Sequence, residues 1–253
     1  MSSSHGFADD FDRTALDEAT WLPSYLPAWS SRAASAATLR LASSCLTLSI
    51  PPDQGLWCAG DHSPPLRVSG IQSGSFSGPA GSTRGQQRFR EGQTVREEQP
   101  RFEGWLPSTG HVEIRCRMTL SPRSMGALWL SGFEDDPAQE RCGELCVVEV
   151  FGRSVSAGTA EVGVGIKPFR DPALTDDFAA PRLAIDVADF HTYAVDWDAD
   201  LAVFTVDGQE VRRCPHPPTY PMQVMLGVFD FPEWSDGHDD HLVPELVVDW
   251  VRG

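Results

Sequence analysis

Ten residues bounded by two glycines, GELCVVEVFG from Gly143 to Gly152, constrain the fold most strongly. Branched and aromatic apolar residues dominate this run, which predicts a largely buried β-strand. The run also contains two carboxylates, Glu144 and Glu149. Because an unpaired carboxylate that faces a packed core is costly, we expect the strand to belong to a sheet with one open face.

The spacing of the two glutamates predicts a β-bulge in this strand. Strict alternation would place Glu144 and Glu149 on opposite faces of the sheet. If Val147 and Val148 share a single pleat position, the two glutamates point to the same face. Cys146 then points the same way, while the two valines face the core.

Two carboxylates on one face suit the hydrolysis of a glycosidic bond with retention of configuration. One carboxylate attacks the anomeric carbon, and the other protonates the leaving oxygen and later activates water. This chemistry needs carboxyl groups roughly 5 to 5.5 Å apart, a separation that the sequence does not give. The alternative is a pair of edge-strand glutamates in solvent.

The rest of the chain predicts an all-β fold of two stacked antiparallel sheets. Apolar runs recur with Gly and Pro at the breaks, and no stretch has the period of a long amphipathic helix. At 253 residues, without a repeat or linker, we expect one domain spanning residues 1–253. Strands are expected at residues 46–50, 111–120, 124–133, 190–197, 201–206 and 210–213, and within 219–231 and 244–251.

Charge and composition narrow the range of partners. Thirty-six acidic against twenty basic residues give a formal charge of −16, which repels nucleic acid and anionic membranes but not a neutral polysaccharide. Neither a basic n-region nor an apolar h-region follows Met1. We therefore expect a monomer that binds no nucleic acid and no membrane, and that is cytoplasmic unless a leader was removed and it is secreted.

The six cysteines predict no metal site and no disulfide framework. They show neither a C-x-x-C pair nor metal-ligand spacing. We expect them to be reduced, as in a cytoplasmic protein. They are Cys45, Cys58, Cys116, Cys142, Cys146 and Cys214.

The stretch GELCVVE resembles the E-x-D-x-x-E signature of glycoside hydrolase family 16, the laminarinase and lichenase family. Other segments resemble this family in order along nearly the whole chain: FADDFDRTALDEATW (7–21), RVSGIQSGSF (67–76), TGHVEIRCRM (109–118), FHTYAVDWDADLAVFTVDGQEVRR (190–213) and VVDWVRG (247–253). The resemblance implies a concanavalin A-like β-jelly roll. It also implies a retaining, endo-acting hydrolase of β-linked polysaccharide, with β-1,3- or β-1,3/1,4-glucan as the first candidate.

The same resemblance implies a role for each polar residue of the strand, with Glu144 as nucleophile and Glu149 as acid/base. Cys146 stands at the position of the family's middle Asp, which helps to orient and charge-tune the nucleophile. A neutral thiol cannot accept hydrogen bonds as a carboxylate does. On the neighbouring strand, where the family often carries a cleft His, this chain offers Lys167. The alternative function is therefore a weakened or inactive relative that binds glycan.

Aromatic residues supply candidates for sugar stacking. Trp57 and Trp105 lie in turn-like surroundings, and Trp129 keeps the second Trp of the family's W-P-A-F-W run. Core packing is the alternative for each of them. The polar stretch 84–105 is expected to be a long loop that walls one end of the cleft. The expected substrate-binding set is Trp57, Trp105, Trp129, Lys167, Phe229 and Trp234.

Acidic residues near the two termini are the candidate metal ligands. The resemblance implies a structural Ca²⁺ held by oxygens from both ends of the chain, for which Asp10 and Asp249 are the candidates. The alternative is solvated turn carboxylates. The HDDH run at 238–241 is a further cluster that fortuitous spacing also explains. No cofactor is expected to be required for the reaction.

Overall fold

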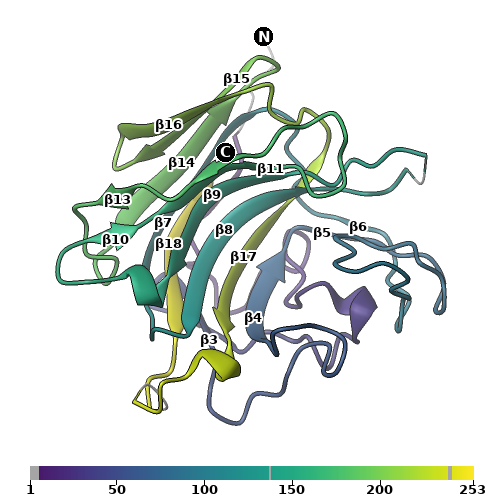
Figure 1. Ribbon diagram of the computed structural model, residues 1–253, viewed down its shortest axis with the longest axis horizontal. Coiled ribbons are helices and arrows are strands. Elements are labelled where there is room, and N and C mark those ends of the chain that lie inside the picture. Colours follow the sequence, from purple (N-terminus) through teal and green to yellow (C-terminus); the bar gives the residue numbers. More distant parts are fainter. Residues whose placement is uncertain (1–5, 137, 239–240) are drawn as a thin grey trace.

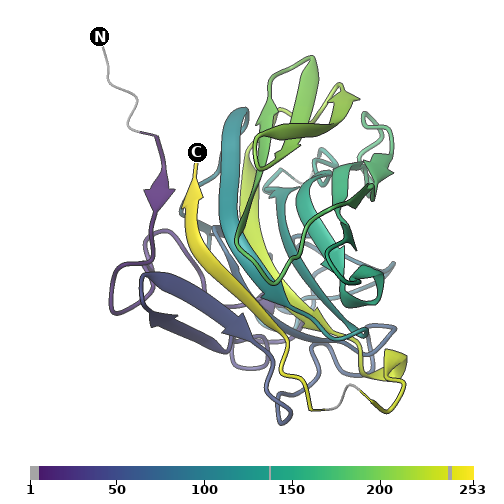
Figure 2. The ribbon, with the colours of Figure 1, turned by 90° about the vertical axis from the view of Figure 1, so that its left-hand side faces the viewer.

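A computed structural model describes residues 6–136, 138–238 and 241–253. Two antiparallel sheets stack face to face (Figures 1 and 2). The larger sheet runs in the order β16 (Gln209–Pro215), β15 (Leu201–Val206), β14 (His191–Trp197), β7 (Gly110–Thr119), β18 (Glu245–Arg252), β3 (Cys45–Ser49) and β2 (Leu39–Ala42), with β1 (Ala8–Asp9) also paired to β18.

The smaller sheet has six strands and carries the two glutamates. Its order is β12 (Asp177–Ala179), β11 (Gly163–Lys167), β9 (Glu144–Phe151), β8 (Ser124–Gly132), β17 (Met222–Asp230) and β4 (Arg67–Gln72). Two short pairs complete the strands, β5 (Gly74–Ser75) with β6 (Phe102–Glu103) and β10 (Ala160–Glu161) with β13 (Arg182–Leu183).

The described residues contain only single-turn helices, η1 (Pro27–Trp29), η2 (Gly152–Ser154) and η3 (Pro232–Trp234). The predicted all-β fold of two antiparallel sheets is confirmed, and each expected strand is present to within a few residues. Within the described ranges, none of these helices has the length and apolar character that crossing a membrane requires.

The main core lies between the two sheets. In β7 every second side chain is buried, because alternate residues point to opposite faces of a strand. Buried residues of β9, β8 and β17 belong to the same apolar cluster. Its members on these four strands include Val112, Ile114, Cys116, Met118, Leu128, Leu130, Leu145, Val147, Val148, Val150, Val224 and Leu226.

A second apolar cluster covers part of the opposite face of the six-stranded sheet. Residues of β8, β9 and β17 pack there against the chain between residues 26 and 95. This is why β8 and β17 are buried along their whole length. The expected open face is thus only partly open, because segments outside the strands, including residues 26–29 and 57–66, pack on it. The cluster includes Trp29, Trp57, Cys58, Leu66, Val95, Met125, Trp129, Cys146, Met225 and Phe229.

The predicted β-bulge is present in β9. Toward β8, Leu128 pairs with Val148 and Trp129 pairs with Cys146, so Val147 is the extra residue. The register with β11 shifts at the same place. Both Val147 and Val148 are buried in the main core. The bulge therefore turns the two halves of the strand so that both glutamates leave the core on one side.

Deletion of Val147 should be tolerated, because the residues on either side already keep a regular register with both neighbouring strands. The cost is the loss of one buried valine, about 2 kcal/mol, which should lower the Tm by roughly 4 to 8 °C. Thermal unfolding followed by circular dichroism measures this shift.

Leu226 is the matched control, since it is equally buried but lies in β17, which pairs regularly with both neighbours. Its deletion forces half of the strand to turn its side chains to the wrong face. We expect loss of cooperative unfolding for this variant. Equal effects of the two deletions would contradict the role of the bulge.

Candidate active site

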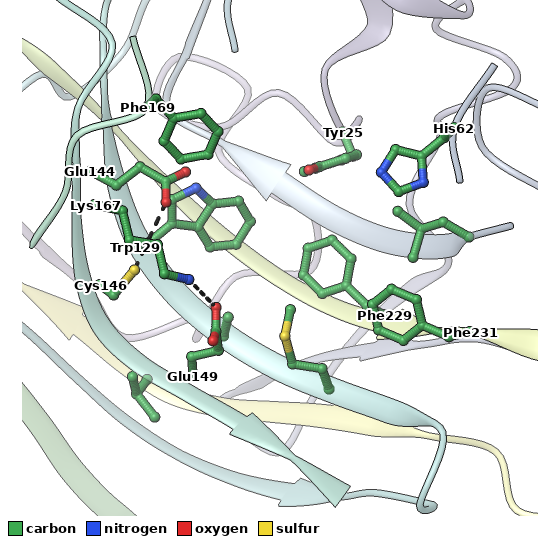
Figure 3. Close-up of a pocket in the computed structure, with 14 residues that line it drawn as sticks. Tyr25, His62, Trp129, Glu144, Cys146, Glu149, Lys167, Phe169, Phe229 and Phe231 are labelled. Carbon is green, nitrogen blue, oxygen red and sulfur yellow. Dashed lines mark hydrogen bonds and ion pairs between the residues drawn. The ribbon is translucent and has the colours of Figure 1, made fainter. Parts of the chain in front are cut away.

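A cavity of about 220 Å³ opens on the outer face of the six-stranded sheet. Side chains of β8, β9, β11 and β17 line it, together with residues from the segment before β4. Glu144, Cys146 and Glu149 all line this pocket, and Lys167 reaches it from β11 (Figure 3). The bulge therefore brings together the residues that the sequence nominated.

Glu144 lies at the buried side of the pocket, with 6% of its surface exposed. Its Oε1 accepts a hydrogen bond from Nε2 of Gln87, and its Oε2 lies 3.9 Å from the Cys146 thiol, which donates to it. Burial raises the pKa of Glu144 to about 7, although nearby Lys167 and the Gln87 amide act in the opposite direction. Burial also raises the pKa of Cys146 well above its usual value, so this group is a neutral thiol.

Glu149 is paired with a cation. Nζ of Lys167 donates to its Oε2 at 2.9 Å, and the same ammonium lies 4.2 Å from the centre of the Phe178 ring. Burial disfavours the ammonium, but Cys146, the ion pair with Glu149 and nearby Glu144 outweigh this effect and raise the pKa of Lys167. The site therefore holds a fixed positive charge between β11 and β9.

Gln87 is a site residue that the sequence did not single out. It belongs to the predicted loop at 84–105 and is 5% exposed, with a left-handed backbone (φ 48°). Its N–H donates to Glu134 at 2.5 Å, and Arg170 pairs with the other oxygen of Glu134 at 2.5 Å. The preceding carbonyl, of Gln86, accepts from Nε1 of Trp29 at 2.8 Å. These contacts fix the amide that faces Glu144.

The pocket contains some of the predicted sugar-binding residues and several others. Trp129, Lys167 and Phe229 line it as expected. Trp234 does not itself line it but stacks at 4.0 Å on Phe231, which does. The residues that the sequence missed include Tyr25, His62, Leu66, Phe169 and Phe231. They come from turns and strand ends, where a sequence pattern gives no direction to a side chain.

Two of the expected stacking platforms, Trp57 and Trp105, lie outside the pocket. Trp57 is 2% exposed and packs in the second cluster. The ring of Tyr25 contacts both Trp57 and Trp129. Trp105 stacks on Phe7 with the ring centres 3.9 Å apart. Neither tryptophan lines the pocket, because both rings are used in packing.

The acidic residues near the termini do not fit a calcium site well. Arg252 donates to Asp10 at 3.2 Å, and Arg115 donates to Asp249, so both carboxylates are engaged by guanidinium groups. In the part of the chain that the structure describes, one group of possible ligands lies within 4.8 Å, and it consists of Glu134, Glu140 and Cys142. The calcium site stays a prediction, and two residues of the HDDH run, 239 and 240, lie outside the described residues. The six cysteines are free thiols.

Comparison with known proteins identifies the family. A family model described as glycosyl hydrolases family 16 matches residues 110–252, from the start of β7 to the end of β18. This match covers more than half of the chain and includes both glutamates of the pocket. A search of curated proteins gave no match.

Solved structures share the fold. A GlcNAcα1-4Gal releasing endo-β-galactosidase from Clostridium perfringens superposes with a TM-score of 0.79 at 23% identity, over 99% of this chain and 63% of that one. The chain therefore spans less than two thirds of that protein.

Two further solved structures match nearly end to end. A structure from work on endo-acting O-glycanases of the human gut microbiota superposes with a TM-score of 0.64 at 21% identity, over 97% of both chains. The catalytic domain of an endo-1,3-β-glucanase (laminarinase) from Thermotoga petrophila RKU-1 superposes with a TM-score of 0.67 at 15% identity, over 97% of this chain and 95% of that one. These likenesses confirm the jelly-roll sandwich that the sequence predicted.

The raised pKa of Glu144 predicts how stability depends on pH. A carboxyl whose folded-state pKa is above its unfolded value of 4.5 contributes stability at low pH that is lost as pH rises through about 7. Glu144→Gln removes the buried charge, so its Tm should exceed that of the wild type at pH 8 but not at pH 5. Calorimetry at the two pH values measures the difference.

Glu161→Gln is the control, because Glu161 is an exposed carboxylate paired with Arg182. Its Tm should differ from the wild type by the same amount at both pH values. A pH-independent gain in Glu144→Gln would show that Glu144 is not a buried, proton-linked group.

Proposed function

Because the chain belongs to glycosyl hydrolases family 16, we propose that it is a retaining, endo-acting glycosidase that hydrolyses a β-linked polysaccharide. The observation that carries this proposal is the bulge of β9, which directs the side chains of Glu144 and Glu149 into one pocket. A retaining mechanism needs two carboxylates that flank the scissile glycosidic bond, roughly 5 to 5.5 Å apart. A protein that only bound glycan would not need this arrangement.

The order of roles follows the motif, and the positions of the two carboxylates fit it, but the free protein has the opposite bias in protonation: burial raises the pKa of Glu144 to about 7, and Lys167 pairs with Glu149. Glu144 is held by two donors at the buried side of the pocket, which suits a nucleophile that must keep one position. Glu149 is less buried, which suits a group that exchanges protons with the leaving group and with water.

The reaction starts with Glu144 ionised and one proton on Glu149: an oxygen of Glu144 attacks the anomeric carbon while Glu149 gives that proton to the leaving glycosidic oxygen. A glycosyl–enzyme ester forms, and the leaving sugar departs as an alcohol. Lys167 then stabilises the carboxylate that remains on Glu149. In the second step Glu149 takes a proton from water, whose oxygen attacks the anomeric carbon and releases Glu144.

The substrate proposed first is β-1,3- or β-1,3/1,4-glucan, in keeping with the laminarinase among the structural relatives. The endo-β-galactosidase among these relatives makes glycans with internal β-galactosides the second candidate. Aromatic side chains around the carboxylates suit either sugar, because both present apolar pyranose faces.

One observation favours a glycan-binding protein without turnover as the competing function. Cys146 stands between the two glutamates as a neutral thiol and supplies no charge beside the nucleophile. The donors Gln87 and Lys167 support activity instead, since they favour the ionised form of Glu144.

Replacement of Glu144 by Gln separates the two functions. The amide keeps the size of the side chain but removes the attacking oxygen anion, so a hydrolase should lose about three orders of magnitude or more in kcat. Affinity for oligosaccharide should stay near that of wild type. Reducing-end release from β-1,3-glucan, mixed-linked glucan and β-galactan, together with calorimetric binding, measures both quantities.

Glu103→Gln serves as control, because this exposed carboxylate pairs with Arg101 on the surface. Its turnover should equal that of the wild type. Wild-type protein that binds one of these glycans but never cleaves it would establish the binding function and reject hydrolysis.

Replacement of Glu149 by Ala tests the acid/base role. Natural glycans have poor leaving groups that need protonation, so kcat/KM should fall by roughly a hundredfold or more. Activated aryl glycosides leave without a proton, and their glycosylation step should change much less. Equal losses on the two substrate types would overturn the assignment of Glu149.

A further inference from the structure

Phe169 is held in an unfavourable conformation at the mouth of the pocket. It follows β11 by two residues and has a left-handed backbone with φ 52°. Residues with a Cβ rarely adopt this region, and a bulky side chain there marks strain. The side chain is also 49% exposed, which makes it one of the few large apolar residues on the surface. Packing in the core therefore does not explain its position.

The residues on both sides of Phe169 are fixed, and this forces its backbone. The Arg170 N–H donates to Sγ of Cys142 at 3.3 Å, and its guanidinium donates to the Arg88 carbonyl at 2.7 Å. The Pro168 carbonyl accepts from the Asp171 N–H at 2.9 Å, which closes a four-residue turn with Phe169 and Arg170 at its centre. Strain of this kind persists only where the surroundings over-determine it, and it concentrates at functional sites.

The ring of Phe169 lies at the end of the pocket that holds Glu144, while Tyr25 and His62 lie at the other end (Figure 3). Among the residues that the structure describes, no aromatic ring stacks on it. Trp234 differs in this respect, since it is exposed but already stacked on Phe231. Phe169 thus presents an uncovered ring face beside a buried carboxylate.

We propose that Phe169 is a stacking platform for the apolar face of a pyranose unit bound at the Glu144 end of the pocket. This inference rests on the proposed glycosidase function and assigns a sugar subsite to a residue that follows no motif. A pyranose ring with equatorial hydroxyls carries its C–H groups on its two faces. Such a face covers the exposed ring, while the hydroxyls at its edge reach polar groups of the pocket.

The test uses variants that accept the left-handed backbone. Phe169→Gly and Phe169→Asn both tolerate positive φ, so neither is expected to lower the Tm. Each is made in the Glu144→Gln background, and its binding to a β-1,3-glucan tetrasaccharide, a mixed-linked glucan tetrasaccharide and a β-galactan tetrasaccharide is measured by calorimetry. Affinity should fall roughly fivefold to tenfold, the effect of uncovering about half of a phenyl ring's apolar surface.

Two further variants serve as controls. Phe169→Tyr keeps the ring and should bind like the parent protein. His216→Gly changes an exposed residue with the same left-handed backbone (φ 52°) that does not line the pocket, and it should leave affinity unchanged.

Three outcomes overturn the inference. Unchanged affinity in Phe169→Gly and Phe169→Asn means that the ring does not contact sugar. A Tm lowered by more than about 5 °C in both variants means that Phe169 is a packing residue. If the parent Glu144→Gln protein binds none of the three glycans while wild type cleaves none, the proposed glycosidase function fails as well.

Discussion

The cost of placing two carboxylates on one largely buried strand governs the structure of this protein. Leu145, Val148 and Val150 of β9 must face the core between the sheets, and an ionised glutamate cannot be left beside them. One extra residue, Val147, resolves the conflict, because it lets both halves of the strand keep their apolar side chains in the core. The pocket exists because of this bulge.

The groups around Glu144 form a different charge arrangement from the one that the motif implies. Where the resemblance implies an Asp between the two glutamates, a neutral thiol donates to Glu144, and a second donor comes from Gln87, 57 residues earlier in the chain. Lys167, on the adjacent strand β11, is a nearby cation, and its positive charge lowers the pKa of Glu144. Glu144 is thus surrounded by two donors and a cation, without a carboxylate between it and Glu149.

The second apolar cluster explains how the donor from the loop is held in place. Trp29 packs against Gly85 so closely that an added Cβ would lie 2.7 Å from its ring, and its indole N–H binds the Gln86 carbonyl. The next residue is Gln87, whose backbone is fixed by Glu134. Coil that packs on the outer face of the sheet therefore both limits the pocket and supplies one of its polar contacts.

The sequence by itself determined the sheets, most strands, the bulge and the two glutamates with Cys146 and Lys167. The sheets, the strands, the bulge and the shared face of Glu144, Cys146 and Glu149 follow from local alternation and from spacing within ten residues, which chain geometry fixes, whereas Lys167 came from the family resemblance. Only the tertiary structure decided the positions of Gln87, Phe169, Trp57 and Trp105. Gln87 and Phe169 lie in turns whose direction depends on contacts with distant residues, and the two tryptophans have the same local pattern whether they face a sugar or a core. The covering of the six-stranded sheet by segments such as residues 26–29 and 57–66 belongs to the same group, because no sequence period in a loop shows which surface the loop will bury.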